Sequence, residues 1–250
     1  MAKLKGKRVL FVGDSLGNNQ WQSLACLLHA AVPSSKYVYQ PGSNLITLKF
    51  PEYGVTLKYL KNEFLVDYSI EKVGRILRLD SINSSSYWKG VDVLVFNSYH
   101  WFDFLEVGGK LIKDMDRMKA YKIGLTTWAK WIDSNIDPTK TRVFFQGIPA
   151  VHFAGADWGE PKEKTCKGQT KPLVGSAYPG KRYPGEHVIK EVLSTMKKHV
   201  FLLDITMLTQ LRKDGHPSLY AEGGMLDCSH WCVAGVPDTW NQLLYTSLIS

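Results

Sequence analysis

Long apolar runs are missing from the sequence, since no uninterrupted stretch approaches the roughly 18 residues that a membrane-spanning helix needs. No membrane span is therefore predicted within these 250 residues. The first residues, MAKLKGKR, lead straight into an apolar strand, so no signal peptide is predicted either. Internal repeats and interdomain linkers are also missing. We therefore expect residues 1–250 to form one domain with a substantial core.

A long basic block is missing too, although the 31 lysines and arginines outnumber the 23 aspartates and glutamates. The net charge of +8 would suit nucleic acid, a pectic polysaccharide or a membrane surface as a partner. Because the basic residues are spread along the chain, we interpret them as a solvated surface and predict no nucleic-acid partner. Hydrophobic residues make up 44% and charged residues 22%, which is typical of a globular protein and excludes a disordered one.

Cysteine is scarce, and the four residues are Cys26, Cys166, Cys228 and Cys232. Cys228 and Cys232, with His230 between them, fit one half of a metal site, but zinc sites usually add a second cluster elsewhere. Only two isolated cysteines remain for that second cluster, so we predict no metal site. An even cysteine count and the glycosylation sequon at Asn83 point instead to a disulfide-permissive, secretory compartment.

The sequence does contain a regular alternation of apolar strands with segments of helical spacing. Strand signals lie at residues 9–12, 43–50, 54–61, 63–69, 73–82, 91–101, 141–148 and 200–206, and helical spacing at 21–28, 110–136, 186–199 and 236–250. Residues 154–186 are rich in Gly, Pro, Lys and Thr and are expected to form a long surface loop. Strands that alternate with helices predict an α/β fold with a parallel sheet covered on both faces.

Ser15 lies where the first predicted strand turns into the first predicted helix, in the stretch RVLFVGDSLGNNQWQSL. Open α/β sheets bind their ligands at such turns, outside the carboxyl ends of the strands. Gly13 allows a sharp turn there and leaves backbone amides pointing outward. Two interpretations stay open at this point: Asp14 or Ser15 caps the helix, or Ser15 is a nucleophile.

A second motif, MLDCSHWC, places Asp227 and His230 three residues apart after the last core strand. Nucleophilic acyl chemistry needs a hydroxyl, a base that takes its proton and an acid that orients the base. Histidine, whose unperturbed pKa is near 6.5, suits the role of base at neutral pH. Because both motifs follow strands at the same edge of the sheet, we predict a catalytic triad of Ser15, His230 and Asp227.

Two further polar groups lie near these motifs. The strand at residues 93–96 delivers Asn97 to the same sheet edge, where its amide and the Ser15 N–H would form an oxyanion hole. The alternative for Asn97 is a hydrogen bond that closes a loop. Asp214 and His216 form a rival acid–base pair, but His216 precedes a proline in a turning segment. We therefore expect a structural or substrate-contact role for His216.

The sequence around these motifs resembles that of a known family. The pairing of GDS near one end with DxxH near the other is similar to the SGNH/GDSL hydrolase superfamily. The wider match is to the plant trichome birefringence-like (DUF231, PC-esterase) proteins and extends over essentially the whole chain. The matching blocks are VGDSLGNNQWQSLAC, EKVGRILRLDSI, DVLVFNSYHW, DPTKTRVFFQGI, LDITMLTQLRKDGHPS and DCSHWCVAGVPDTWNQLLY.

The resemblance implies an SGNH-like three-layer sandwich, with a central, mostly parallel sheet flanked by helices. It assigns the triad to Ser15, Asp227 and His230. Members are typically Golgi polysaccharide O-acetyltransferases, some acting on xylan or mannan and others linked to pectin. The oxyanion and substrate-binding residues that we expect are Gly13, Asp14, Asn97 and Trp231.

Two departures from the family pattern affect these expectations. Gly17 and Asn18 stand where many members carry Ser-Arg or a similar pair, so any contact made by that arginine is not carried over. Members also usually have an N-terminal membrane anchor and a cysteine-rich segment before the GDS block. Neither segment is in this chain, so we expect a short form or a truncated one, located in the Golgi lumen, the secretory pathway or the cell wall.

Three functions remain open from the sequence. The first is acetyl transfer to a cell-wall polysaccharide through an acyl-enzyme, with an acetyl donor as co-substrate and no bound cofactor. The second uses the same triad with water as the acceptor, which makes the protein a pectin or xylan acetylesterase. The third is a carbohydrate-binding wall protein without catalysis, in which aromatic side chains stack on sugars. The candidates for stacking are Tyr99, Trp101, Trp158 and Trp231.

The resemblance also implies a disulfide between the long loop and the C-terminal motif. We expect Cys166 to pair with Cys232, which leaves Cys26 and Cys228 as free thiols whose usual partners lie in the family's N-terminal segment. The alternative is a Cys166–Cys228 bridge, because Cys228 and Cys232 flank the same turn.

Overall fold

A seven-stranded sheet forms the centre of the computed structural model, which describes residues 1–72, 74–83, 85–99, 104–112 and 115–249. The strands lie in the order β11–β10–β7–β1–β4–β3–β2. Their bounds are β1 Arg8–Gly13, β2 Val38–Gln40, β3 Leu45–Phe50, β4 Val55–Lys61, β7 Val93–Phe96, β10 Arg142–Gln146 and β11 Phe201–Leu203. Neighbouring strands pair in parallel from β11 to β4, and β3 pairs antiparallel with both β4 and β2. The predicted mostly parallel sheet is confirmed.

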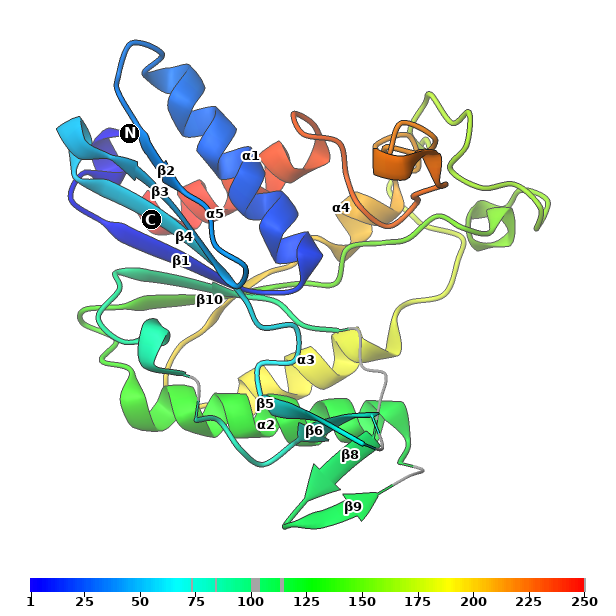
Figure 1. Cartoon of the computed structure of the whole chain (residues 1–250). Helices are drawn as coiled ribbons and strands as arrows, with labels where there is room; N and C mark the ends of the chain where they lie inside the picture. Colours follow the sequence, from blue (N-terminus) through cyan, green and yellow to red (C-terminus); the bar gives the residue numbers. More distant parts are fainter. Residues whose placement is uncertain (73, 84, 100–103, 113–114, 250) are drawn as a thin grey trace.

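Helices cover both faces of this sheet, as Figure 1 shows. Helices α1 (Ser15–Ala31) and α5 (Val236–Ile249) pack together on one face, and α2 (Arg117–Asn135) and α3 (Pro184–Thr195) pack together on the other. A short helix α4 (Thr206–Gln210) follows β11. The 3-10 turns are η1 Ala2–Leu4, η2 Pro51–Tyr53, η3 Ser85–Trp88, η4 Gly155–Trp158 and η5 Glu222–Gly224. The fold is therefore the expected three-layer α/β sandwich.

Strand side chains alternate between the two cores because successive residues of a strand point to opposite faces. In β1, Val9 and Phe11 pack with α1 and α5, whereas Leu10 and Val12 pack with α2 and α3. Each of these four side chains is at most 1% exposed. A strand buried on both faces has the continuous apolar run that the sequence shows at this position. The run ends at Gly13, where the chain leaves the sheet.

A second, smaller sheet lies beside α2 and has the order β5–β6–β8–β9. Its strands are β5 Asp67–Glu71, β6 Gly74–Arg78, β8 Phe104–Val107 and β9 Lys110–Ile112. The sequence predicted a helix from residue 110, but α2 begins only at Arg117. Gly108 and Gly109 have φ values of 59° and 72° and turn β8 back into β9, while Asp116 caps α2 by accepting from the Lys119 N–H. The predicted start of this helix was therefore wrong.

Candidate active site

Ser15 is the first residue of α1 and lies directly beyond the carboxyl end of β1. Asp14 is the N-cap, and its Oδ1 accepts a hydrogen bond from the Leu16 N–H at 2.9 Å. Because Asp14 caps the helix, the Ser15 hydroxyl is left for another partner. Asp14 thus takes the capping role that the sequence left open, and Ser15 stays a candidate nucleophile.

The Ser15 hydroxyl meets the C-terminal motif. Ser15 Oγ lies 2.7 Å from His230 Nε2, and His230 Nδ1 lies 2.7 Å from Asp227 Oδ2. With a proton on Nδ1, the imidazole donates to Asp227 and accepts from the Ser15 O–H. The structure thus brings together three side chains from opposite ends of the chain, in the arrangement expected for a serine nucleophile and its base.

Asp227 is held in this orientation by its own turn. Its Oδ1 accepts from the Ser229 N–H and hydroxyl, each at 2.9 Å, and from the His230 N–H at 3.0 Å. Partial burial raises the pKa of Asp227, but these hydrogen bonds from His230 and Ser229 outweigh it and lower the pKa to about 2. The carboxylate is therefore charged at neutral pH and fixes the imidazole tautomer.

Asn19, one turn after Ser15, ties the two motifs together. Its Nδ2 donates to the Trp231 carbonyl at 3.1 Å, and the Trp231 N–H donates to its Oδ1 at 3.0 Å. The side chain is buried, so both hydrogen bonds are shielded from water. Sequence reasoning missed this residue. The available signal was a polar side chain at a position of α1 that packs against the protein interior.

Two buried histidines, His152 and His216, support the segment that carries His230. His216 Nδ1 donates to the His230 carbonyl at 2.6 Å, and His216 Nε2 lies 2.7 Å from His152 Nδ1. His152 Nε2 in turn lies 3.0 Å from the Gln210 carbonyl. Burial lowers the pKa of both rings, that of His216 to about 4. Of the two roles considered for His216, these contacts support the structural one.

Asp214, the other member of the rival acid–base pair, has a different partner. The role of His152 was not predicted from the sequence. Asp214 pairs with Arg212 through two contacts of 2.9 and 3.1 Å. His152 was missed because a lone histidine in the stretch IPAVHFAG has no neighbouring partner in the sequence.

Asn97 lies at the expected sheet edge, directly after β7, but its amide group is buried. Its Nδ2 donates to Asp14 Oδ1 at 2.5 Å, and the side chain is 4% exposed. A Cβ on Gly13 would lie 1.8 Å from Asn97 Oδ1, and one on Gly17 would lie 2.2 Å from it. Both glycines are therefore needed for Asn97 to reach the helix cap.

Two of the aromatic candidates for sugar stacking, Trp158 and Trp231, are buried. Trp231 is 2% exposed, with its ring 4.1 Å from that of His216 and 6.0 Å from that of Trp240. Trp158 is 3% exposed. Tyr99 is partly buried, and the remaining candidate, Trp101, lies outside the described residues. In this structure Trp231 supports the histidine segment and does not line a groove.

The disulfide joins Cys166 to Cys228, so the favoured pairing of Cys166 with Cys232 was wrong and the alternative is confirmed. The backbone of His152 explains the choice. Its N–H donates to the Cys228 carbonyl, and its carbonyl accepts from the Cys166 N–H, each at 2.9 Å. Cys166 and Cys228, which are both hydrogen-bonded to the His152 backbone, are buried. Cys232 lies beyond the turn and is exposed, as is Cys26. The free thiols are thus Cys26 and Cys232.

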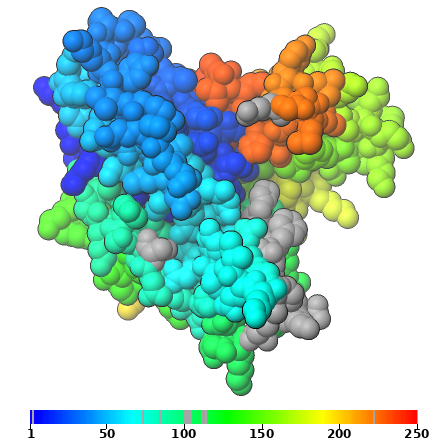
Figure 2. All heavy atoms as spheres, viewed as in Figure 1, coloured from blue at the N-terminus to red at the C-terminus, as the bar shows by residue number. Residues whose placement is uncertain are grey.

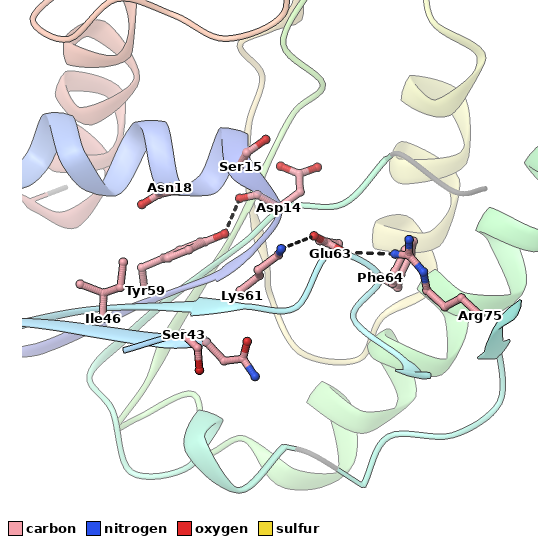
Figure 3. A pocket seen from close by; sticks show the side chains of 11 residues that line it. Asp14, Ser15, Asn18, Ser43, Ile46, Tyr59, Lys61, Glu63, Phe64 and Arg75 are labelled. Atoms are coloured by element: carbon pink, nitrogen blue, oxygen red, sulfur yellow. Dashed lines mark hydrogen bonds and ion pairs between the residues drawn. The ribbon is translucent and has the colours of Figure 1, made fainter. Parts of the chain in front are cut away.

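A groove of about 500 Å³ opens next to Ser15, between the start of α1, the start of β3 and the end of β4. Figure 3 shows Asp14 and Ser15 on one side of it and a row of charged side chains on the other. Glu63 bridges Lys61 at 3.1 Å and Arg75 at 3.5 Å. Tyr59 lines the groove and donates to the Asp14 carbonyl at 2.9 Å, and burial raises its pKa, so the phenol stays protonated.

The described part of the chain contains no cluster of three histidine, cysteine or acidic side chains that could hold a metal ion. Cys228 is bridged to Cys166 and His230 contacts Ser15, so the half-site considered from the sequence is not formed. Over the same described residues, none of the helices is both long and apolar enough to cross a membrane.

Comparison with known proteins gives a consistent result. Residues 1–247 match the model of the PC-Esterase family, described as a GDSL/SGNH-like acyl-esterase family found in Pmr5 and Cas1p. Protein trichome birefringence-like 42 of Arabidopsis thaliana is 54% identical over 262 residues, which cover 100% of this chain and 73% of that protein. Protein trichome birefringence-like 38 is 53% identical, over 99% of this chain and 68% of that protein. Protein trichome birefringence is 37% identical, over 98% of this chain and 46% of its own length.

Proposed function

The chain belongs to the PC-esterase family, and from this premise we propose that residues 1–250 form a single catalytic domain that O-acetylates a cell-wall polysaccharide. One observation carries the assignment: Ser15 Oγ lies 2.7 Å from His230 Nε2, and His230 Nδ1 lies 2.7 Å from the charged Asp227 carboxylate. This geometry suits a serine nucleophile, its general base and the acid that orients the base.

In the first half-reaction, His230 Nε2 takes the proton of the Ser15 hydroxyl as Oγ attacks the carbonyl carbon of the acetyl donor. The tetrahedral oxyanion accepts a hydrogen bond from the Ser15 N–H. This group lies at the N-terminus of α1, where the helix dipole favours negative charge. Collapse breaks the bond to the donor's leaving group, which takes the proton from His230. The product is acetyl-Ser15. Asn97 serves this step by holding the Asp14 cap, together with Gly13.

In the second half-reaction, His230 takes the proton of a sugar hydroxyl, whose oxygen attacks the acetyl carbonyl. The ester to Ser15 breaks, Oγ recovers the proton from His230, and the sugar leaves as its acetyl ester. Asp227 keeps its charge throughout and stabilises the imidazolium that forms twice. The chemistry needs no bound cofactor, only an acetyl donor and a polysaccharide acceptor.

Acetylester hydrolysis is the second candidate, with water in place of the sugar hydroxyl. Two observations favour it: the matching family is described as an acyl-esterase family, and the His230 side chain is 40% exposed, so water reaches the base. Which reaction dominates depends on how well a bound acceptor excludes water from acetyl-Ser15.

The proposed location is the secretory pathway, the Golgi lumen or the cell wall. The Cys166–Cys228 bridge supports it, because disulfides persist in oxidising compartments. The polysaccharide partner is proposed as xylan, mannan or pectin on the family resemblance alone.

The deciding experiment incubates the purified protein with acetylated and unacetylated xylan, mannan and pectin, with and without an acetyl donor, and follows acetate and sugar esters by NMR. New sugar esters support transfer, and free acetate from acetylated polymer supports hydrolysis. The Ser15→Ala variant is the negative control for both transfer and hydrolysis. No acetyl movement on any of the polymers would contradict the enzyme assignment.

A further inference from the structure

A second groove, of about 320 Å³, adjoins the one at Ser15. The two share Asn44 and Lys61 in their walls, and the Lys61 N–H donates to the Asn44 carbonyl at 2.7 Å. This backbone pair lies just before the start of β3 and at the end of β4, so the two grooves adjoin there, and the second one lies toward the small sheet. Figure 2 shows the segment around residues 60–75, coloured cyan, on the face turned toward the viewer.

Two tyrosines line the second groove. Tyr68 comes from β5 and is 48% exposed, and Tyr87 comes from η3 and is 55% exposed. Large aromatic side chains are usually more deeply buried, so two half-exposed rings in one groove mark a surface that is suited to a ligand. Neither ring belongs to the triad or to the groove that opens at Ser15.

The ring of Tyr68 is held in place by two side chains that line the first groove, Phe64 and Arg75. The rings of Tyr68 and Phe64 form a T-shaped pair with a centroid distance of 5.9 Å, and the Arg75 guanidinium lies 6.0 Å from the Tyr68 ring centroid. A ring fixed in this way loses little freedom when a ligand covers it. Its exposed part is therefore preorganised for stacking.

The polar groups of the second groove suit hydroxyls rather than a free cation. The Asp67 carboxylate accepts from the Ser81 hydroxyl at 2.6 Å and from the Asn83 N–H at 2.8 Å, so its charge is already solvated by the protein. Asn44 and Asn62 also line this groove, and Asn62 Oδ1 accepts from the Leu65 N–H. Half-exposed aromatic rings next to amide groups match a pyranose, which has apolar C–H faces and a rim of hydroxyls.

We infer that Tyr68 and Tyr87 form an aromatic subsite that binds the acceptor polysaccharide at sugars remote from the one that reacts at Ser15. The inference rests on the proposed function and adds to it a requirement for a polymeric acceptor. Binding energy from remote sugars would hold the reacting hydroxyl against acetyl-Ser15 and displace water from it. Longer acceptors would then bind more tightly, up to the length that spans both grooves.

The test measures binding and turnover separately. Calorimetric dissociation constants are determined for xylan, mannan and pectin oligosaccharides of increasing length, using wild type, Tyr68→Ala, Tyr87→Ala and the double variant. Tyr68→Phe keeps the ring, and Tyr37→Ala removes an equally exposed tyrosine outside both grooves. Circular dichroism and thermal melting establish that each variant is folded.

We expect wild type to bind at least one series more tightly as chain length grows. Each alanine variant should weaken the longest oligosaccharide about tenfold, as expected for the loss of one aromatic contact, and leave the shortest nearly unchanged. Tyr68→Phe and Tyr37→Ala should behave as wild type. The subsite is refuted if no series shows a length dependence, or if the double variant keeps the wild-type dependence. Length-dependent binding without acetyl movement on any polymer would contradict the proposed function and leave the subsite standing.

Discussion

Asn19 and Trp231 exchange two hydrogen bonds across 212 positions of the sequence, one from the Asn19 amide to the Trp231 carbonyl and one from the Trp231 N–H back to the Asn19 oxygen. The first residue lies one turn from Ser15 on α1, and the second directly follows His230. The distance between Ser15 and His230 is therefore fixed by the contact of the Asn19 side chain with the Trp231 backbone as well as by their own hydrogen bond. A further hydrogen bond joins α1 to α5, the helix that follows the His230 segment, since Asn241 donates to the Gln20 carbonyl at 3.0 Å.

Replacing Asn19 tests the role of its two hydrogen bonds with Trp231. Asn19→Ala leaves a buried N–H and a buried carbonyl of Trp231 without partners, which costs about 1–3 kcal/mol of stability for each unsatisfied group. We also expect kcat to fall at least tenfold, because the His230 segment is no longer held against α1. Chemical denaturation and steady-state kinetics measure the two effects. Gln22→Ala, on the exposed side of the same helix, is the matched control; an Asn19→Ala enzyme with both values like wild type would contradict the role.

The triad makes a graded prediction. Ser15→Ala and His230→Ala should each lower acetyl transfer and hydrolysis by roughly a thousandfold or more, because the nucleophile or its base is gone. Asp227→Asn should cost less than either, since it alters the tautomer of His230 and keeps the nucleophile. Single-turnover assays with a small acetyl ester compare the three. Near-wild-type turnover by folded Ser15→Ala protein would end the triad assignment.

The sequence predicted the triad because each member belongs to a local pattern. GDS follows an apolar strand, DxxH follows the last core strand, and parallel strands bring both to one edge of the sheet. Asn97 was correctly placed at that edge, yet its contact with Asp14 could not be foreseen. That contact depends on how closely Gly13 and Gly17 let two backbones approach, which is a tertiary distance and not a spacing in the sequence.

Other features were beyond the sequence for the same reason. Cys228 and Cys232 flank one turn, and only the backbone ladder through His152 decides which of them meets Cys166. The start of α2 was misjudged because the apolar spacing of the β9 strand continues smoothly into the helix. Only the glycine turn before β9 and the Asp116 cap separate the two elements.

The disulfide assignment predicts two free thiols, Cys26 and Cys232, in the oxidised protein. Closing the 62-residue separation between Cys166 and Cys228 restricts the unfolded chain and is worth about 4 kcal/mol on the chain-entropy model. Cys166→Ser should therefore lower the melting temperature strongly, whereas Cys232→Ser should hardly change it. Thiol titration and mapping of bridged peptides check the pairing, and a bridged Cys232 would contradict it.

We expect the buried pair of His152 and His216 to make the stability of the protein sensitive to acid. If both rings were protonated, two N–H groups would face each other across the 2.7 Å contact, so full protonation breaks the support under His230. Burial lowers the pKa of His216 from 6.5 to about 4 and lowers that of His152 as well. Between pH 6.5 and pH 4 the unfolded chain binds more protons than the folded one. The free energy of unfolding therefore decreases as the pH falls through this range.

For His216 alone this loss amounts to about 3 kcal/mol, measured as the free energy of unfolding in urea at a series of pH values. The contribution of Asp227 is separable, because its pKa is lowered from 3.8 to about 2 and its stabilisation is lost only as the pH falls between those values. His216→Asn should be less stable at pH 7 and show a flatter curve between pH 6.5 and 4. His29→Asn, at an exposed histidine, should keep the wild-type slope. A wild-type slope in His216→Asn would show that the pair does not control the acid response.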